Sequence, residues 1–182
     1  MKRIASVLFA STMFTGCQTV PDNPIPTVDH VEIERFMGDW YVIANIPTFI
    51  EKGAHNAVET YALNSDDSIK TTFRFNQDNF DGPVKVYHPT GYIVDRESNA
   101  HWGMQFIWPF KSEYRIVYLD ENYQHTIIGR SKRDYLWIMA RKPQISQKTY
   151  ELLINKSASL GYDVSKIQPV PQKWTDQGAP SL

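Results

Sequence analysis

Apolar and polar side chains alternate along most of this chain, and that period of two constrains its fold more than any other feature of the sequence. Successive side chains of a β-strand point to opposite faces, so the alternation predicts strands with one buried face. Eight segments carry it: 39–46, 56–63, 68–76, 83–94, 101–107, 112–119, 123–130 and 134–141. Because short connections join them, we expect an all-β fold, an eight-stranded antiparallel up-and-down barrel whose closure leaves no exposed edge.

One helix is predicted after the last strand. Pro143 ends that strand, Ser146 is a suitable N-cap, and Gly161 stands where a helix would stop. The positions expected to share one face, packed on the outside of the barrel, are Tyr150, Leu153, Ile154, Ser157 and Ala158. Residues 164–167 are predicted to add a short strand, and residues 171–182 to form a loose polar tail.

Composition and motifs exclude several classes of protein. The 19 Lys and Arg residues nearly balance the 20 Asp and Glu residues, so no strong basic field indicates a nucleic-acid partner. A single cysteine excludes an internal disulfide and a multi-cysteine zinc site. The histidines at 30, 55, 88, 101 and 125 have no spacing typical of a metal site, and no nucleophile elbow, phosphate loop or dinucleotide fingerprint is present. We expect no metal, no cofactor, no catalytic residues and no enzymatic activity.

The N-terminal segment is predicted to be an export signal. Lys2 and Arg3 precede an apolar stretch at 4–14, which is too short to span a bilayer, so residues 1–16 are interpreted as a signal peptide. The lone cysteine, Cys17, then follows Phe-Thr-Gly. This resembles the lipobox of bacterial lipoproteins, in which the cysteine is lipidated, although Phe14 stands where that motif usually has an aliphatic residue. The alternative is an ordinary cleaved signal with an incidental thiol.

The residues after the cysteine are predicted to connect an anchor to the folded part of the chain. Gln18, in such lipoproteins, implies sorting to the outer membrane, here on its periplasmic face. Residues 17–29 contain Pro21, Pro24 and Pro26 among polar residues and are interpreted as an extended tether. The barrel and its helix are expected over residues 30–170.

Three motifs resemble those of the lipocalin family. Gly38 and Trp40 open the first predicted strand, Asp120 lies in the turn after the sixth, and Arg141 closes the eighth. Leu119 stands where many members of the family have Thr. Segment 133–138 resembles most closely the bacterial outer-membrane lipoprotein lipocalins and their apolipoprotein D-like relatives. The resemblance spans about residues 30–170 and implies the barrel fold with one outer helix.

The first and last motifs have a structural interpretation. We expect Trp40 to plug the barrel floor, with Gly38 letting the chain enter without a Cβ clash. Arg141 can lay its guanidinium group over the indole and donate to carbonyls of the entering segment. Like Asp120, these residues are interpreted as structural and not as ligand contacts.

The parity of the strands assigns nine large side chains to the barrel interior as candidate ligand contacts: Phe73, Phe75, Tyr87, Trp102, Met104, Phe106, Tyr114, Ile116 and Trp137. Such a lining suits an acyl chain, with phenols placed to meet a polar head. Periodicity alone is equally consistent with a filled core, and the lipocalin resemblance favours a cavity. The register of 134–141 stays open, because Leu136 and Ile138 compete with Trp137 for the inner face.

Two further features bear on the interior and its opening. Glu59 shares a face with Tyr61, so it could bind a ligand head group. The alternative, which we favour, is that Glu59 lies in water at the rim or that the register is shifted by one residue. Segment 46–56 is long for a hairpin and resembles a lipocalin lid loop, with Phe49 and Ile50. Aromatic residues at the mouth, including Phe110, would either capture lipid or pair two subunits in a homodimer.

The expected function is that of a membrane-anchored protein that holds a fatty acid or lysophospholipid in an apolar cavity, for lipid storage, transport or envelope maintenance. Its expected partners are a small apolar ligand and the outer membrane, reached through the N-terminal anchor. Two alternatives stay open: a lipocalin-fold enzyme acting on a bound lipid, and a structural lipoprotein with a filled barrel.

Overall fold

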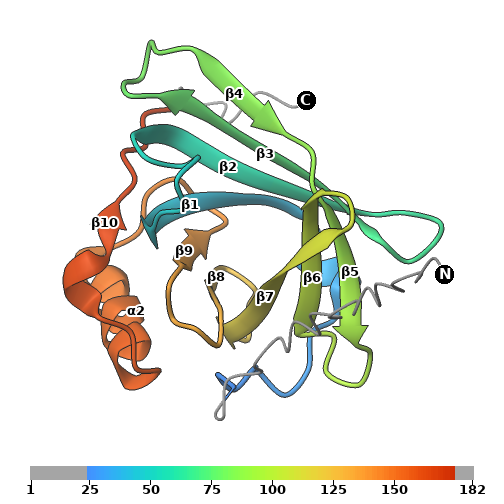
Figure 1. Cartoon of the computed structure of the whole chain (residues 1–182). Helices are drawn as coiled ribbons and strands as arrows, with labels where there is room; N and C mark the ends of the chain where they lie inside the picture. Colours follow the sequence, from blue (N-terminus) through green and yellow to red (C-terminus); the bar gives the residue numbers. More distant parts are fainter. Residues whose placement is uncertain (1–23, 175–182) are drawn as a thin grey trace, which may run out of the picture.

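Nine strands, each antiparallel to its neighbours, form the wall of a barrel in the computed structural model, which describes residues 24–174 (Figure 1). They are β1 (Gly38–Ile46), β2 (Ala54–Leu63), β3 (Ile69–Gln77), β4 (Val84–Tyr87), β5 (Thr90–Asp95), β6 (His101–Ile107), β7 (Phe110–Leu119), β8 (His125–Gly129) and β9 (Leu136–Ala140). β9 pairs with β1 and closes the sheet on itself. The predicted signal peptide, Cys17, residues 18–23 and the tail from residue 175 lie outside the described residues.

The fold class is confirmed, because β4 and β5 together occupy one of eight positions around the barrel. Both pair with β3, where the sequence predicted one strand over 83–94. Pro89 lies between them and has no N–H group to donate, so the strand breaks there. The Pro89 carbonyl still accepts a hydrogen bond from the Thr71 N–H at 3.2 Å, which holds the break against β3.

The helix α2 (Gln147–Ser159) packs outside the barrel, as Figure 1 shows. Its N-cap is Ser146, whose hydroxyl oxygen accepts from the Thr149 N–H at 3.1 Å, and Gly161 follows its end at a φ of 87°. Leu153 and Ser157 are fully buried against the barrel, whereas Ala158, predicted on the same face, is exposed. Among the described residues, no helix is both long and apolar enough to cross a membrane.

The register of the last strand is settled by this helix. Leu136 and Ile138 belong to the apolar cluster that contains Leu153 of the helix, so both side chains point outward. Trp137, which lies between them in β9, therefore points into the barrel.

The chain after the helix departs from the prediction. Residues Val164–Lys166 form a short 3₁₀ helix, η1, because the Asp163 carboxylate caps it by accepting from the Ser165 N–H at 3.1 Å. The short strand comes later, as β10 (Gln168–Pro169), and pairs with β1. The first residues of the expected loose tail also lie on the barrel, since the Gln172 side-chain amide donates to the carbonyl of Val42 at 2.7 Å.

The described end of the expected tether is packed on the barrel instead of extending away from it. Ile25 is completely buried, and the Val28 N–H donates to the Ile116 carbonyl on β7 at 2.9 Å. The Val31 N–H donates to the Ser98 carbonyl at 2.8 Å, just before the short helix α1 (Ile33–Phe36) leads into β1. The N-terminal segment therefore lies along the outside of the barrel wall before the chain reaches α1 and the start of β1.

Candidate functional site

The end of the barrel at which β1 begins, which we call the floor, is closed by Trp40. Its indole N–H donates to the Phe36 carbonyl at 2.8 Å, and its side chain is fully buried. The Arg141 guanidinium carbon lies 3.9 Å from the centre of the indole, and the group donates to the carbonyls of Asp39 at 2.8 Å and Arg35 at 2.7 Å. This one side chain thus ties the last strand to the segment that enters the first.

Gly38 is needed at this closure for a different reason from the one predicted. A Cβ atom there would meet the nearest Arg141 nitrogen at 3.4 Å, which is ordinary contact. Its φ of 91° lies in the left-handed region, which glycine adopts at little cost. The backbone turn into β1, and not space for a side chain, requires glycine.

Asp120 shapes a turn at the same end of the barrel. Its carboxylate accepts from the Gln124 N–H at 2.7 Å and lies 2.6 Å from the Nδ1 atom of His125. These contacts fix the connection between β7 and β8 and place Asp120 away from the cavity.

A cavity of about 460 Å³ lies above the floor and is lined mainly by apolar side chains. Six of the nine predicted contacts line it: Phe73, Tyr87, Met104, Phe106, Tyr114 and Trp137. The lid loop between β1 and β2 contributes Thr48, Phe49, Ile50 and Glu51 at its upper end. The volume is within the range of pockets that hold small ligands.

The other three predicted contacts are buried but do not line the cavity. Trp102 stacks on the Tyr114 ring, with centroids 5.1 Å apart and planes 9° apart, and it packs edge-on against Phe36 at the floor, with centroids 5.5 Å apart. Phe75 packs against Phe73 at a centroid distance of 5.1 Å, and Ile116 lies in the same apolar core. Strand parity identifies inward-facing residues but not which of them the cavity reaches.

Glu59 points into the barrel, so the favoured interpretation, at the rim in water or out of register, was wrong. It lines the cavity at 9% exposure, and its neighbours across the sheet are Trp40 and Phe73, two other inward-facing residues. The Tyr61 hydroxyl donates a hydrogen bond to its carboxylate. Burial raises the pKa of Glu59 to about 7, although the Tyr61 hydrogen bond opposes this and the Glu51 charge adds to it.

Tyr61 connects this carboxylate to a second phenol. The hydroxyl oxygens of Tyr61 and Tyr114 lie 2.7 Å apart. Thr71, which pairs with Tyr61 across the sheet, lines the cavity at 1% exposure, and its hydroxyl has no hydrogen-bond partner among the described residues. We call Glu59, Tyr61, Thr71 and Tyr114 the polar floor.

Glu51, in the lid loop, is a residue that the sequence reasoning missed. Its carboxylate accepts from the Trp137 indole N–H at 2.8 Å and from the Thr48 N–H at 2.8 Å, which joins the lid to β9. Burial raises its pKa. The Thr-x-x-Glu spacing of Thr48 and Glu51 is that of a capping box and was the available signal.

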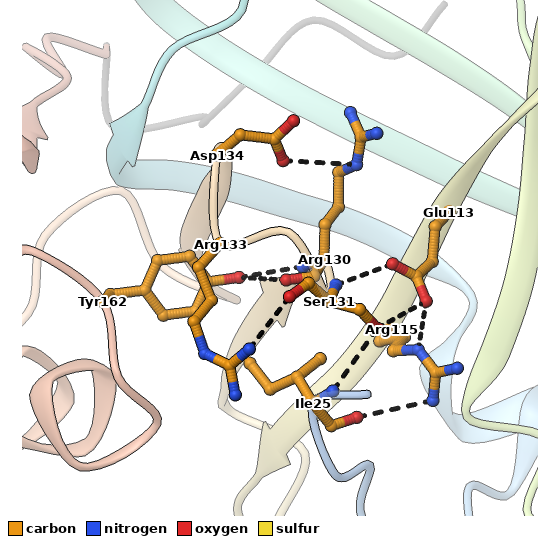
Figure 2. Close-up of polar contacts among 8 residues, drawn as sticks. All are labelled: Ile25, Glu113, Arg115, Arg130, Ser131, Arg133, Asp134 and Tyr162. Carbon is orange, nitrogen blue, oxygen red and sulfur yellow. Dashed lines mark hydrogen bonds and ion pairs between the residues drawn. The ribbon is translucent and has the colours of Figure 1, made fainter. Parts of the chain in front are cut away.

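Polar contacts beside the mouth hold the N-terminal segment (Figure 2). The Glu113 carboxylate accepts from the Ser131 N–H at 2.6 Å and from the Arg115 Nε at 2.5 Å. Burial alone would raise the pKa of Glu113, but hydrogen bonds from Arg115 and Ser131 bring it below its ordinary value. The Ser131 hydroxyl in turn accepts from the Ile25 N–H at 3.3 Å.

The described chain therefore begins at the open end of the barrel. Ser131 lies in the loop between β8 and β9, whose residues Arg130 and Tyr135 line the cavity together with the lid loop. Four side chains at this end form an exposed apolar rim: Phe49 and Trp108 at 82% exposure, Phe110 at 76% and Ile107 at 72%. Exposure of this degree places the rim in contact with the surroundings and not with the core.

A closed eight-stranded barrel with a plugged floor and a cavity at the other end is the architecture of small-ligand-binding barrels. Solved structures share the barrel fold. Insecticyanin from the tobacco hornworm Manduca sexta matches with a TM-score of 0.65 and 14% identity, over 85% of this chain and 86% of that one. Lobster apocrustacyanin A1 matches with a TM-score of 0.64 and 10% identity, over 86% and 94% of the two chains. At these identities the likeness concerns the fold alone.

The chain belongs to the lipocalin family, which confirms the resemblance in its motifs. The family model described as a lipocalin-like domain matches residues 31–172. Temperature-induced lipocalin-1 of Arabidopsis thaliana is 34% identical, over 81% of this chain and 83% of that protein. Outer membrane lipoprotein Blc of Escherichia coli is 28% identical over 90% and 92%, and apolipoprotein D of Macaca fascicularis is 30% identical over 81% and 80%.

Proposed function

We propose that this lipocalin is a membrane-anchored protein that holds one fatty acid or lysophospholipid in its barrel, for lipid storage, transport or envelope maintenance. The observation that carries the proposal is the cavity of about 460 Å³ with its mainly apolar lining, from Phe73 and Met104 below to Phe106 at the mouth. An acyl chain gains free energy by leaving water for such a lining. This lining is also what distinguishes the proposal from a structural lipoprotein with a filled barrel.

The charged end of such a lipid belongs at the mouth. Arg130 lines the cavity there, and its Nε lies 3.5 Å from an Asp134 carboxylate oxygen. A guanidinium group is well suited to a carboxylate or phosphate. Glu51 and Glu113 also line the cavity towards the mouth, but their carboxylates accept hydrogen bonds from Trp137 and Arg115. An ionised head at the opposite end would instead meet the Glu59 carboxylate, with no basic residue among those lining that end. The lipid therefore enters tail first.

An anchor at Cys17 would place the mouth towards the outer membrane. Cys17 precedes Ile25 by eight residues, which can span at most about 28 Å when fully extended. Ile25 is held beside Ser131 at the mouth end, where the apolar rim is exposed. The relatives named outer membrane lipoprotein Blc support this location. The rim would then contact lipid, whereas a homodimer would bury it between two subunits.

Native mass spectrometry of the gently purified protein tests the proposed function. We expect a mass increase equal to one acyl lipid, which a fluorescent fatty acid displaces. A protein that carries no lipid and excludes the fluorescent fatty acid would overturn the proposal in favour of a filled barrel. Conversion of the bound lipid to a product would identify the enzyme alternative.

A further inference from the structure

We propose that the polar floor is a binding subsite for a hydroxyl group carried near the tail end of the acyl chain. This inference rests on the proposed function, since it requires a chain to enter tail first. It accounts for the polar groups at the base of a mainly apolar cavity. Glu59, Thr71 and Tyr114 line the cavity, and the Tyr61 hydroxyl contacts both Glu59 and Tyr114.

The floor contains a polar group that lacks a partner. Thr71 is 1% exposed, and its hydroxyl makes no hydrogen bond among the described residues, although it lines the cavity. A buried hydroxyl without a partner is costly, so a ligand atom that hydrogen-bonds to it has an advantage over a methyl group in the same place. The Glu59 carboxyl group accepts one hydrogen bond, from Tyr61, and its two oxygens can take part in further bonds with a ligand.

The chemistry of the floor favours a hydroxyl over a second carboxylate. None of its four residues is basic, so an ionised carboxylate would face Glu59 without a counter-charge. A hydroxyl suits either protonation state of Glu59, because it donates to the carboxylate and accepts from the carboxylic acid. It can also accept from, or donate to, the Thr71 hydroxyl.

The strand pairing places these groups at neighbouring positions around the base of the cavity. Thr71 pairs directly with Tyr61, and Phe73, two residues along the same face, pairs with Glu59. Tyr114 meets Tyr61 from the other side of the barrel, with the two hydroxyl oxygens 2.7 Å apart. The polar groups therefore gather at the base of the cavity, beside Trp40, which pairs with Glu59 on β1.

The experiment compares two ligands that differ only at the tail, dodecanoate and 12-hydroxydodecanoate, by titration calorimetry. In an apolar cavity the added hydroxyl weakens binding, because it must be desolvated. In the wild-type protein we expect it to tighten binding, by roughly tenfold, through new hydrogen bonds at the floor.

Variants on one strand separate the floor from a general effect on the barrel. Thr71→Val should abolish the preference for the hydroxylated ligand, measured as the ratio of the two dissociation constants, and circular dichroism checks that the barrel is folded. Thr71→Ser should retain the preference. Thr72→Val is the matched control, because Thr72 lies on the opposite face of β3, 3.4 Å from the His88 ring.

The outcomes distinguish the two proposals. Equal affinity of the wild type for both ligands, or a preference for dodecanoate, overturns the floor subsite and leaves the proposed function standing. A preference that survives Thr71→Val also overturns it. Failure of both ligands to bind overturns both proposals together.

Discussion

The Tyr61 hydroxyl donates a hydrogen bond to the Glu59 carboxylate, two residues away on the same strand, and both side chains are buried. An acid buried in this way prefers its neutral form, and its pKa rises to about 7 from an ordinary value of 4.5. The burial of Glu59, which the hydrogen bond from Tyr61 only partly offsets, therefore makes the stability of the barrel depend on pH.

The free energy of unfolding should fall as the pH rises from about 5 to 8. Between its unfolded and folded pKa values, Glu59 is protonated in the folded protein and ionised in the unfolded chain, so folding is favoured at the lower pH. The contribution lost is on the order of 2–3 kcal/mol. Urea unfolding at both pH values measures it, with Glu59→Gln as the comparison. The other titratable groups are present in both the wild type and the Glu59→Gln variant. If the free energy of unfolding changed with pH in the same way in both, the pH dependence would not come from Glu59.

Replacing the floor plug should destabilise the barrel without any ligand present. Trp40→Ala removes a fully buried indole together with its contact to Arg141, and we expect a loss of about 3–5 kcal/mol. Trp108→Ala is the matched control, since that indole is 82% exposed and its loss should cost less than about 0.5 kcal/mol. Chemical denaturation measures both; similar losses in the two variants would show that Trp40 is not the plug.

Removing the hydrogen bond between the lid loop and β9 should raise the rate of ligand dissociation while changing the free energy of unfolding less. Trp137→Phe keeps an aromatic ring in the cavity wall but removes the indole N–H that donates to Glu51. Glu51 would then be buried with one partner fewer, and we expect the dissociation rate of a fluorescent fatty acid to rise about tenfold. Stopped-flow displacement measures the rate. Tyr135→Phe, which also changes a cavity-lining ring, should leave it unchanged.

The predicted anchor can be tested through its cysteine. Cys17→Ala should shift the protein from the membrane fraction to the soluble fraction, because lipidation requires the thiol. Fractionation followed by immunoblotting measures the distribution. A variant that stays on the membrane would contradict anchoring at this position.

We expect the apolar rim to bind phospholipid vesicles even in a protein that lacks the lipid anchor. Trp108→Ser combined with Phe110→Ser should reduce binding to phospholipid vesicles by about tenfold or more, since both side chains are largely exposed at the mouth. Flotation with vesicles measures binding, and Val94→Ser, an exposed apolar position on β5, is the control. If the variants instead convert a dimer to a monomer in sedimentation, the rim is a subunit interface.

Much of the fold was predictable because alternation and turn residues report on local geometry. The positions of the barrel strands, the Ser146 cap and the Gly161 stop all follow from short-range rules. The failures have a different origin. The packing of Ile25 against the barrel and the pairing of Gln168 with Asn45 depend on residues far apart in the chain, which no local pattern records.

The candidate site shows the same division. Parity assigned Trp102 and Tyr114 correctly to the interior, but only the structure shows that Trp102 packs against Phe36 at the floor while Tyr114 lines the cavity. Glu59 was misjudged because a carboxylate is expected in water, whereas the Tyr61 hydroxyl supplies a partner inside. Glu51 was overlooked because its partner Trp137 is 86 residues away.

The route of the N-terminal segment has a mechanical consequence. A pull on the chain from the mouth side acts along the length of the segment, so the contacts of Ile25, Val28 and Val31 resist it together, in shear. The load is shared along the outside of the wall before it reaches β1. A force applied to the N-terminal segment would therefore leave the cavity undistorted until the contacts of Ile25, Val28 and Val31 broke.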